Sequence, residues 1–273
     1  MKNKILIYDD NCPLCNWYSG LFVKCGMLPK DGRKPFSVLD PVLLDKIDIS
    51  RSRNEIPLLD TASGRVDYGI DALIAILGQR CPFIRVSGHI PPVKWGLKKF
   101  YKLISYNRKL IVARKCGTGA IDCSPDLNYF YRFAFMFICL VFNTLALIPL
   151  HYNVLINLPY YHLSHIQLQG AHFALVLVNC LLSLSFNKEK ATVYLGQVNM
   201  LALETVLLLL PSFALIALPG SDRIIAIYLV LIAILVFKEY LRRMDYAGVL
   251  LSNKWIASIN LASLAAFILV LFG

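Results

Sequence analysis

Apolar residues are unevenly distributed along this chain, and their pattern changes near residue 125. Before that point, short apolar runs alternate with polar stretches, as in a water-soluble domain. From residue 131 onward the runs become long enough to cross a bilayer, which takes about 20 residues each. The pattern therefore predicts a soluble domain over 1–92, a connecting segment over 93–130 and a transmembrane helical domain over 131–273.

The apolar runs of the last part predict about five membrane spans. Their approximate bounds are Tyr131–Leu150, Leu168–Phe186, Val193–Leu218, Ile224–Phe237 and Trp255–Phe272. A hydrophobic content of 57% is too high for a single water-soluble domain and agrees with this division.

Lysine and arginine gather in alternate connections between the spans. The segment before the first span is rich in them, and the second-to-third and fourth-to-fifth connections carry Lys188, Lys190, Lys238, Arg242, Arg243 and Lys254. The connections in between contain only Arg223, and the tail contains none. Because basic loops stay in the cytoplasm, we expect a multi-pass integral membrane protein with its N-terminal domain in the cytoplasm and its C-terminus outside. Much of the net charge of +11 follows from this topology, so no nucleic-acid partner is expected.

The spacing of apolar residues in the soluble domain predicts strands and helices in alternation. The expected strands are Lys4–Tyr8, Pro35–Leu39, Ile56–Asp60 and Arg65–Tyr68, and the expected helices are Asn16–Leu28, Pro41–Asp48 and Asp71–Leu77. This is an α/β arrangement with the element order of the thioredoxin fold. The fold class expected for the whole chain is thus an α/β thioredoxin-like domain followed by an all-α transmembrane bundle.

The stretch Cys12–Pro13–Leu14–Cys15 lies where the first strand ends and the first helix begins. The attacking species in thiol–disulfide exchange is the thiolate, and a helix N-terminus stabilises an anion. Pro13 suits the first turn, since its missing N–H would have no partner there. With two residues between them, Cys15 is able to reach Cys12 and resolve a mixed disulfide. The placement favours a redox pair.

Three stretches carry a family resemblance. Asp9-x-x-Cys12-x-x-Cys15, followed by "RVDYGIDAL" at 65–73 and "FYKLISYNRKL" at 100–110, resembles the DCC family, which is described as thiol-disulfide oxidoreductase-like. The resemblance covers about residues 4–115 and none of the spans, and it implies thiol–disulfide exchange as the activity class. The family commonly has Asp-Gly-Asp-Cys where this chain has Asp9–Asp10–Asn11–Cys12.

Roles follow for the residues of this motif. We expect Cys12 to be the exposed nucleophile and Cys15 the buried resolving thiol. Asp9 either accepts the proton of Cys15 or caps the helix. Asp9 and Asp10 disfavour a thiolate, and the interior of the motif supplies no cation. We therefore expect a reductant or a mild exchanger, which suits the cytoplasm.

Pro57 is a further candidate site residue, because it precedes the third predicted strand. Thioredoxin-like proteins place a cis proline at this point, facing the CxxC pair. The alternative is a trans proline that begins an edge strand.

Other uses of the cysteines compete with the redox interpretation. A structural zinc site needs four ligands, usually in two close pairs, and Cys25, Cys81 and His89 supply no second pair. No metal or other cofactor is therefore expected, and a purely structural cysteine pair is the other alternative. Cys116 and Cys123, just before the first span, either relay electrons towards the membrane or are reduced thiols in a loop.

The segment "VKWGLKKFYKLISYNRKLIVARK" at 93–115 has lysines at helical spacing and apolar residues on much of the remaining face. One interpretation is an interfacial helix that lies on anionic lipid headgroups. The other is a last helix that packs on the soluble core with its basic face in water. The two are compatible.

Polar residues inside the spans suggest more than an anchor. Glu204 lies in the third span with Gln197 two turns earlier, Asn143 lies in the first, and His172 and Asn179 lie in the second. At 1.5 Å per residue, Asn143, Asn179 and Glu204 reach comparable depths. Ionisable residues within a membrane indicate function by default. Hydrogen bonding between helices is the alternative.

Together these patterns predict a membrane-tethered thiol–disulfide oxidoreductase that acts on an unknown protein or on a small thiol or disulfide. The alternative is a transporter or small-molecule-binding bundle whose thioredoxin-like domain is a docking module with idle cysteines. The cysteine motif favours the first function, and Glu204 with its polar neighbours favours the second.

Overall fold

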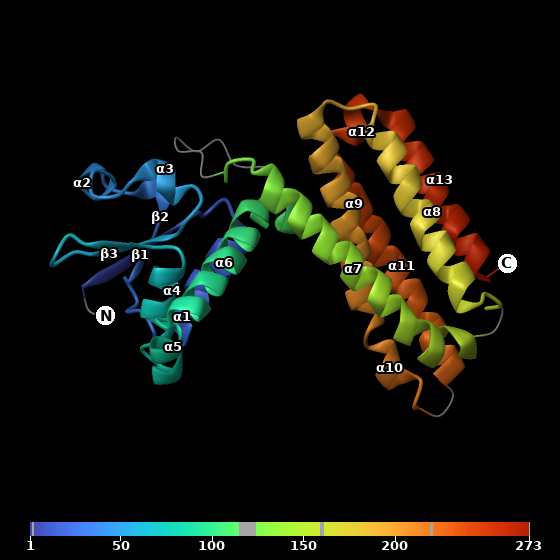
Figure 1. Ribbon diagram of the computed structural model, residues 1–273, viewed down its shortest axis with the longest axis horizontal. Helices are drawn as coiled ribbons and strands as arrows, with labels where there is room; N and C mark the ends of the chain where they lie inside the picture. The colour runs from blue at the N-terminus through green and yellow to red at the C-terminus, as the bar shows by residue number, and fades with distance from the viewer. Residues whose placement is uncertain (2, 115–123, 159–160, 219–220, 273) are drawn as a thin grey trace. The chain divides into compact units, whose positions relative to one another are not determined.

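The computed structural model describes residues 1, 3–114, 124–158, 161–218 and 221–272 (Figure 1). The chain divides into two compact units, Met1–Arg132 and Phe133–Gly273. Each unit is built around its own hydrophobic core, so the two are described in turn.

The first unit contains a four-stranded mixed sheet. Its strands are β1 (Lys4–Tyr8), β2 (Arg33–Pro35), β3 (Pro57–Asp60) and β4 (Val66–Tyr68). They lie in the order β2-β1-β3-β4, with β1 parallel to β2 and antiparallel to β3, and β3 antiparallel to β4. The central strands β1 and β3 carry the most deeply buried side chains, because both of their faces are covered.

Side chains alternate between the two faces of β1, and each face has its own cover. Leu6 and Tyr8 pack with α1 (Pro13–Lys24) and α4 (Ile70–Leu77). Ile7 points to the other face and packs against Phe36, Leu39 and Ile47. The expectation of an α/β layer arrangement is confirmed to this extent.

Two elements of this unit differ from the sequence-based expectation. The second strand ends at Pro35, and Phe36–Val38 forms a 3₁₀ turn (η1) that buries Phe36. The helix expected over Pro41–Asp48 is replaced by two short helices, α2 (Pro41–Leu44) and α3 (Ile49–Ser52). Asp40 and Asp48 each cap one of them by accepting a backbone N–H, so each starts a new helix.

The basic segment forms α6 (Pro91–Val112), which follows the short α5 (Pro82–Ser87). The Tyr101 hydroxyl accepts a hydrogen bond from the backbone N–H of Ile56 at 2.9 Å, and the Ser105 hydroxyl donates to the carbonyl oxygen of Asn54. The interpretation of a last helix packed on the soluble core is therefore confirmed. Contact with anionic lipid stays a prediction.

The second unit contains five long helices. They are α7 (Tyr129–Asn153, which begins in the first unit), α8 (His165–Ser183), α9 (Lys188–Leu209), α11 (Ser221–Tyr246) and α13 (Lys254–Phe272). Short turns complete the unit: η2 (Leu155–Asn157), α10 (Ser212–Leu215) and α12 (Val249–Ser252). All five long helices are long and apolar enough to cross a membrane, which confirms the expectation of a multi-pass helical bundle.

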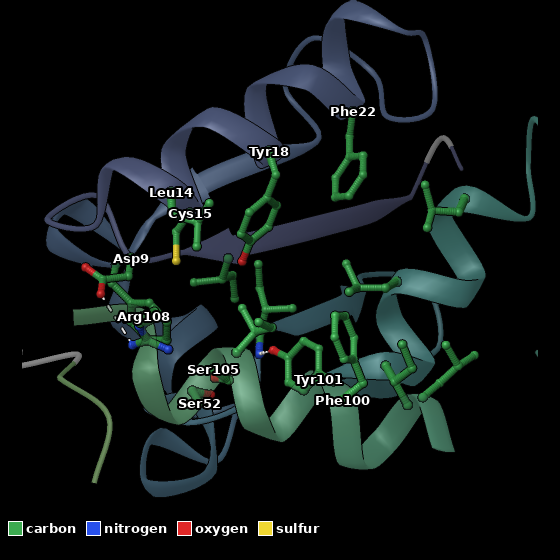
Figure 2. Close-up of a pocket in the computed structure, with 18 residues that line it drawn as sticks. Asp9, Leu14, Cys15, Tyr18, Phe22, Ser52, Phe100, Tyr101, Ser105 and Arg108 are labelled. Carbon is green, nitrogen blue, oxygen red and sulfur yellow. Dashed lines mark hydrogen bonds and ion pairs between the residues drawn. The ribbon is translucent and has the colours of Figure 1, made fainter. Parts of the chain in front are cut away.

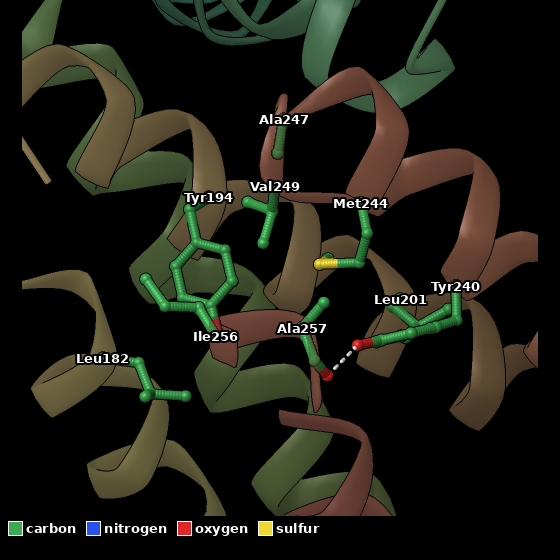
Figure 3. Close-up of a cluster of buried hydrophobic side chains, with 9 residues drawn as sticks. All are labelled: Leu182, Tyr194, Leu201, Tyr240, Met244, Ala247, Val249, Ile256 and Ala257. Atoms are coloured by element: carbon green, nitrogen blue, oxygen red, sulfur yellow. Dashed lines mark hydrogen bonds between the residues drawn. The ribbon is translucent and has the colours of Figure 1, made fainter. Parts of the chain in front are cut away.

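A hydrophobic cluster joins the long helices α8, α9, α11 and α13 and the short α12 (Figure 3). Tyr194 of α9 is fully buried among side chains that include Met244 of α11 and Ile256 of α13. The Tyr240 hydroxyl donates a hydrogen bond to the carbonyl oxygen of Ala257 at 2.8 Å. This satisfies a polar group that would be costly to bury alone.

The helix α11 is longer than its apolar run predicts. Lys238, Arg242 and Arg243 lie in its last turns instead of in a loop, and Arg243 is fully buried. The helix continues because neighbouring carboxylates on α9 and α11 pair with Arg243. The orientation of the bundle, which rests in part on these residues, stays a prediction.

Candidate functional site

The cysteine motif occupies the junction between β1 and α1. After β1 ends at Tyr8, the backbone N–H of Cys12 donates to the carbonyl oxygen of Asp9 at 3.2 Å and closes a turn. Cys12 is the N-cap residue of α1, Pro13 is its first helical residue, and Cys15 lies in its first turn. The helix N-terminus therefore faces the thiols, as the sequence predicts.

Both thiols are buried. The exposed fraction is 2% for Cys12 and 4% for Cys15. The expectation that Cys12 is exposed is therefore wrong. The last turns of α6 bring Arg108 close to the motif, and the ribbon of α6 lies opposite α1 in Figure 2.

Asp9 is buried and pairs with Arg108. The distance between Asp9 Oδ2 and Arg108 Nη2 is 3.4 Å, and Asp9 also accepts the backbone N–H of Asn11 at 3.0 Å. The N-cap residue of α1 is Cys12 rather than Asp9, and the hydrogen bond that Asp9 accepts from the backbone comes from Asn11, which precedes the helix. The role of Asp9 as a proton acceptor for Cys15 stays a prediction. Asp10 turns away from the thiols and accepts a hydrogen bond from the Ser37 hydroxyl at 2.8 Å.

The two thiols differ in acidity. The pKa of Cys12 is lowered to about 6, first because its sulfur accepts a hydrogen bond from Cys15 and further because Arg108 is close, although burial opposes the shift. The pKa of Cys15 is raised well above its usual value, because Cys15 donates that hydrogen bond and is buried. At neutral pH the pair therefore holds a Cys12 thiolate beside a protonated Cys15. Asp9 opposes the thiolate as expected, but the hydrogen bonds from the Cys15 side chain and backbone outweigh it, and Arg108 adds a cation from outside the motif.

Tyr18 is a second residue of the site that sequence reasoning missed. It follows Cys15 by one helical turn, and its hydroxyl hydrogen-bonds the Cys15 thiol. Burial raises the pKa of Tyr18 well above its usual value, so the hydroxyl stays protonated. The spacing of three residues on one helix is the signal that could have identified it.

Pro57 does not take the expected place. Across the described ranges of the chain no peptide bond is cis, so the bond before Pro57 is trans. Pro57 begins β3 opposite Tyr68 of β4, and β3 is a central strand rather than an edge. The first residue of a strand tolerates proline because its N–H is dispensable there. Both the cis expectation and the edge-strand alternative are thus corrected, and Ile56 rather than Pro57 lines the space beside Cys15.

A pocket of about 410 Å³ adjoins Cys15 (Figure 2). The Cys15 sulfur and the Tyr18 hydroxyl point into it from α1, while Tyr101 and Arg108 lie on the opposite wall formed by α6. Most of the remaining wall is aliphatic or aromatic, with Phe22 at the end away from Asp9 and Arg108.

Among the described residues, no group of three or more His, Cys, Asp or Glu side chains is placed so that it could hold a metal ion. Cys12 and Cys15 are both free thiols, as are the exposed Cys25 and the half-buried Cys81. Cys116 and Cys123 lie outside the described residues, so their proposed relay role stays a prediction.

Of the polar residues predicted within the bundle, Glu204 and Gln197 come together around Arg243. The Arg243 guanidinium pairs with Glu204 of α9 and with Glu239 of α11, and its Nη1 donates to Gln197 Oε1 at 2.6 Å. Glu204 is therefore not an isolated intramembrane acid. Sequence reasoning missed this cluster because it placed Arg243 in a loop.

The other predicted bundle residues lie in separate places. Asn179 Oδ1 accepts hydrogen bonds from the Tyr194 hydroxyl at 2.7 Å and from Asn260. His172 Nε2 lies 3.4 Å from the Thr144 hydroxyl. Asn143 is buried, and its side-chain oxygen has no hydrogen-bond partner among the residues that the structure describes. Glu204 and Gln197 are the members that Arg243 brings together, and a polar site that also includes Asn143, Asn179 and His172 stays a prediction.

The Arg243 cluster predicts a stability difference between two neighbouring arginines. Arg243→Ala leaves two carboxylates without their shared cation, and removing one partner of a buried pair costs about 3–5 kcal/mol. Arg242→Ala removes a half-exposed pair with Glu239 and should cost about 1 kcal/mol or less. The free energy of unfolding of the purified protein in detergent measures both. Equal losses for the two variants would contradict a structural role for the cluster.

Comparison with family models, with curated proteins and with solved structures gave no significant match to this chain. The argument for function therefore rests on the geometry of the cysteine site.

Proposed function

We propose that this chain is a membrane-bound thiol–disulfide oxidoreductase of the DCC family, with a thioredoxin-like first unit and a dithiol/disulfide centre at Cys12 and Cys15. The observation that carries the proposal is the difference in pKa between the two thiols. Cys12, with its pKa lowered to about 6, is a thiolate at neutral pH, while Cys15 is held protonated beside it. Thiol–disulfide exchange requires these two roles, a thiolate that attacks the partner and a second thiol that later resolves the mixed disulfide.

The chemistry proceeds in two steps. The Cys12 thiolate attacks one sulfur of a disulfide, forms a mixed disulfide and releases the other sulfur as a thiolate. Cys15 then loses its proton and attacks Cys12, which forms the Cys12–Cys15 disulfide and releases the second thiolate. The reverse sequence oxidises a dithiol partner.

The acidity of Cys12 bears on the direction of electron flow. A stabilised thiolate favours the dithiol form over the disulfide, which makes a pair more oxidising than one with ordinary thiols. A reductant was expected from the two aspartates and from a motif interior without a cation, whereas Cys15 and Arg108 together lower the pKa of Cys12. We therefore propose an exchanger that readily accepts electrons.

Several features support the thioredoxin-like assignment of the first unit. The CxxC motif follows β1 and opens α1, and β1 lies centrally between a parallel β2 and an antiparallel β3. The hairpin of β3 and β4 then leads into α4.

A redox titration tests the proposal. The full chain in detergent is equilibrated with 2-mercaptoethanol and its disulfide at varied ratios, alkylated, and mapped by mass spectrometry. We expect Cys12 and Cys15 to lose their reactivity together in one two-electron transition and to form a disulfide with each other. A pair that stays reduced at every ratio, or that reacts one cysteine at a time, would contradict the proposal.

A transporter or small-molecule-binding bundle is the second candidate. Within the described residues, the buried side-chain oxygens of Asn143, Gln169 and Asn199 lack hydrogen-bond partners, and a polar ligand would satisfy such groups. Glu204, which first suggested this function, is already paired with Arg243. A redox titration in which the cysteines stay idle would favour this candidate.

A further inference from the structure

The pocket beside Cys15 has the size of a small-molecule site. Its volume of about 410 Å³ lies within the range of about 300–1,000 Å³ that is typical of ligand pockets. The walls come from α1, α4, α6 and the sheet of the first unit, so one folded unit forms the whole pocket.

The walls favour an apolar ligand. Leu73, Leu77 and Leu97 are among the many aliphatic side chains that line the pocket. Two of the polar lining groups are already engaged, because the Ser52 and Ser105 hydroxyls donate to backbone carbonyl oxygens. Other polar side chains of the pocket, among them Cys15, Tyr18 and Arg108, lie towards one end of it (Figure 2).

The charges at that end favour a neutral ligand that accepts hydrogen bonds. The Arg108 cation is opposed by the Asp9 carboxylate and by the Cys12 thiolate, so an anionic group gains little there. The Cys15 thiol donates to Cys12 and the Tyr18 hydroxyl hydrogen-bonds Cys15, so Arg108, which carries five N–H groups, is the donor at this end of the pocket with the greatest capacity. A carbonyl oxygen is a group that a guanidinium donor fits.

Burial restricts how a redox partner reaches the thiols. Since only 2–4% of either cysteine is exposed, a partner has to be small enough to enter the pocket and approach Cys15. The chain also carries five membrane-spanning helices, and the bilayer is where neutral, apolar electron acceptors concentrate.

We propose that this pocket binds a quinone and that the quinone oxidises the Cys12/Cys15 dithiol. In this step the Cys12 thiolate and the Cys15 thiol form a disulfide bond and give two electrons to the quinone ring. The proton of Cys15 and one proton from water go to the two quinone oxygens, which yields a hydroquinone. The inference rests on the proposed function, because it supplies the electron acceptor for that dithiol.

The experiment uses the reduced full chain in lipid nanodiscs and decylubiquinone as the probe. Loss of quinone absorbance and loss of alkylation at Cys12 and Cys15 are followed together, and exchange with bis(2-hydroxyethyl) disulfide is measured in parallel. We expect the wild type to consume one quinone for each disulfide formed.

Cavity-filling variants test where the quinone binds. Leu73→Trp and, in case the first variant folds poorly, Leu97→Trp should slow oxidation by the quinone about tenfold or more. The ratio of the quinone rate to the rate of exchange with the small disulfide should fall in both variants, since a bulkier pocket wall excludes the larger quinone more than the small disulfide. Leu21→Trp is the matched control, because Leu21 is exposed on α1 and does not line the pocket.

The outcomes separate this inference from the proposed function. If the wild type exchanges with the small disulfide but does not reduce the quinone, the inference is wrong and the proposed function stands. The same holds if both filling variants react with quinone at the rate of Leu21→Trp. If neither the disulfide nor the quinone reacts, both proposals are wrong.

Discussion

Cys15→Ser is expected to accumulate a stable mixed disulfide at Cys12, whereas Cys12→Ser is expected to accumulate none. Cys12→Ser removes the thiolate with the lowered pKa, so no covalent complex forms. Cys15→Ser keeps the nucleophile and removes the thiol that releases the partner. After incubation with bis(2-hydroxyethyl) disulfide, most Cys15→Ser molecules should carry the adduct at Cys12 in a peptide map.

Controls distinguish this outcome from the competing uses of the cysteines. The adduct should disappear with reductant and be absent from the double variant. A metal site predicts that both single variants lose bound metal alike, and an idle pair predicts no difference from the wild type. Equal behaviour of Cys12→Ser and Cys15→Ser would refute the redox interpretation.

Arg108→Gln is expected to raise the pKa of the Cys12 thiol. The wild-type thiol has a pKa of about 6, partly because of the Arg108 charge. Without that cation the pKa should rise towards the value of a free cysteine, which is about 8.5. The midpoint of the pH–rate profile for iodoacetamide alkylation at Cys12 measures this shift. The midpoint is a better readout than a single rate, because a less acidic thiol gives a more reactive thiolate.

Two further variants make this measurement specific. Arg108→Lys keeps the charge and should restore a midpoint near that of the wild type. Lys99→Gln removes an exposed lysine from the same helix and should leave the midpoint unchanged. An unchanged midpoint in Arg108→Gln, with the protein folded, would show that Arg108 does not tune the thiol.

The sequence was most informative where one local pattern decides the structure. The five spans follow from long apolar runs, and the position of Cys12 at the start of α1 follows from a strand, a proline and a helical pattern. Local pattern was misleading at Pro35–Leu39, where the buried Phe36 begins a 3₁₀ turn and the buried Leu39 follows that turn instead of continuing a strand.

The residues that sequence reasoning missed act over long separations. Arg108 lies 99 positions from its partner Asp9, and Arg243 lies 39 positions from Glu204. No periodicity marks such pairs, and a basic residue near a helix end looks the same whether it faces water or a carboxylate. The burial of Cys12 is likewise a property of the packed unit, and no local pattern in the sequence marks it.

The position of Arg108 on α6 also sets the size of the smallest transferable redox module. A fragment cut at residue 92 would keep both cysteines and the whole sheet but would lose α6, which supplies Arg108, Tyr101 and one wall of the pocket. A gene fusion that moved this chemistry to another protein would therefore have to carry the chain through Val112. The helix that leads towards the first span is part of the unit that forms the cysteine site, and it is not a spacer that recombination could exchange freely.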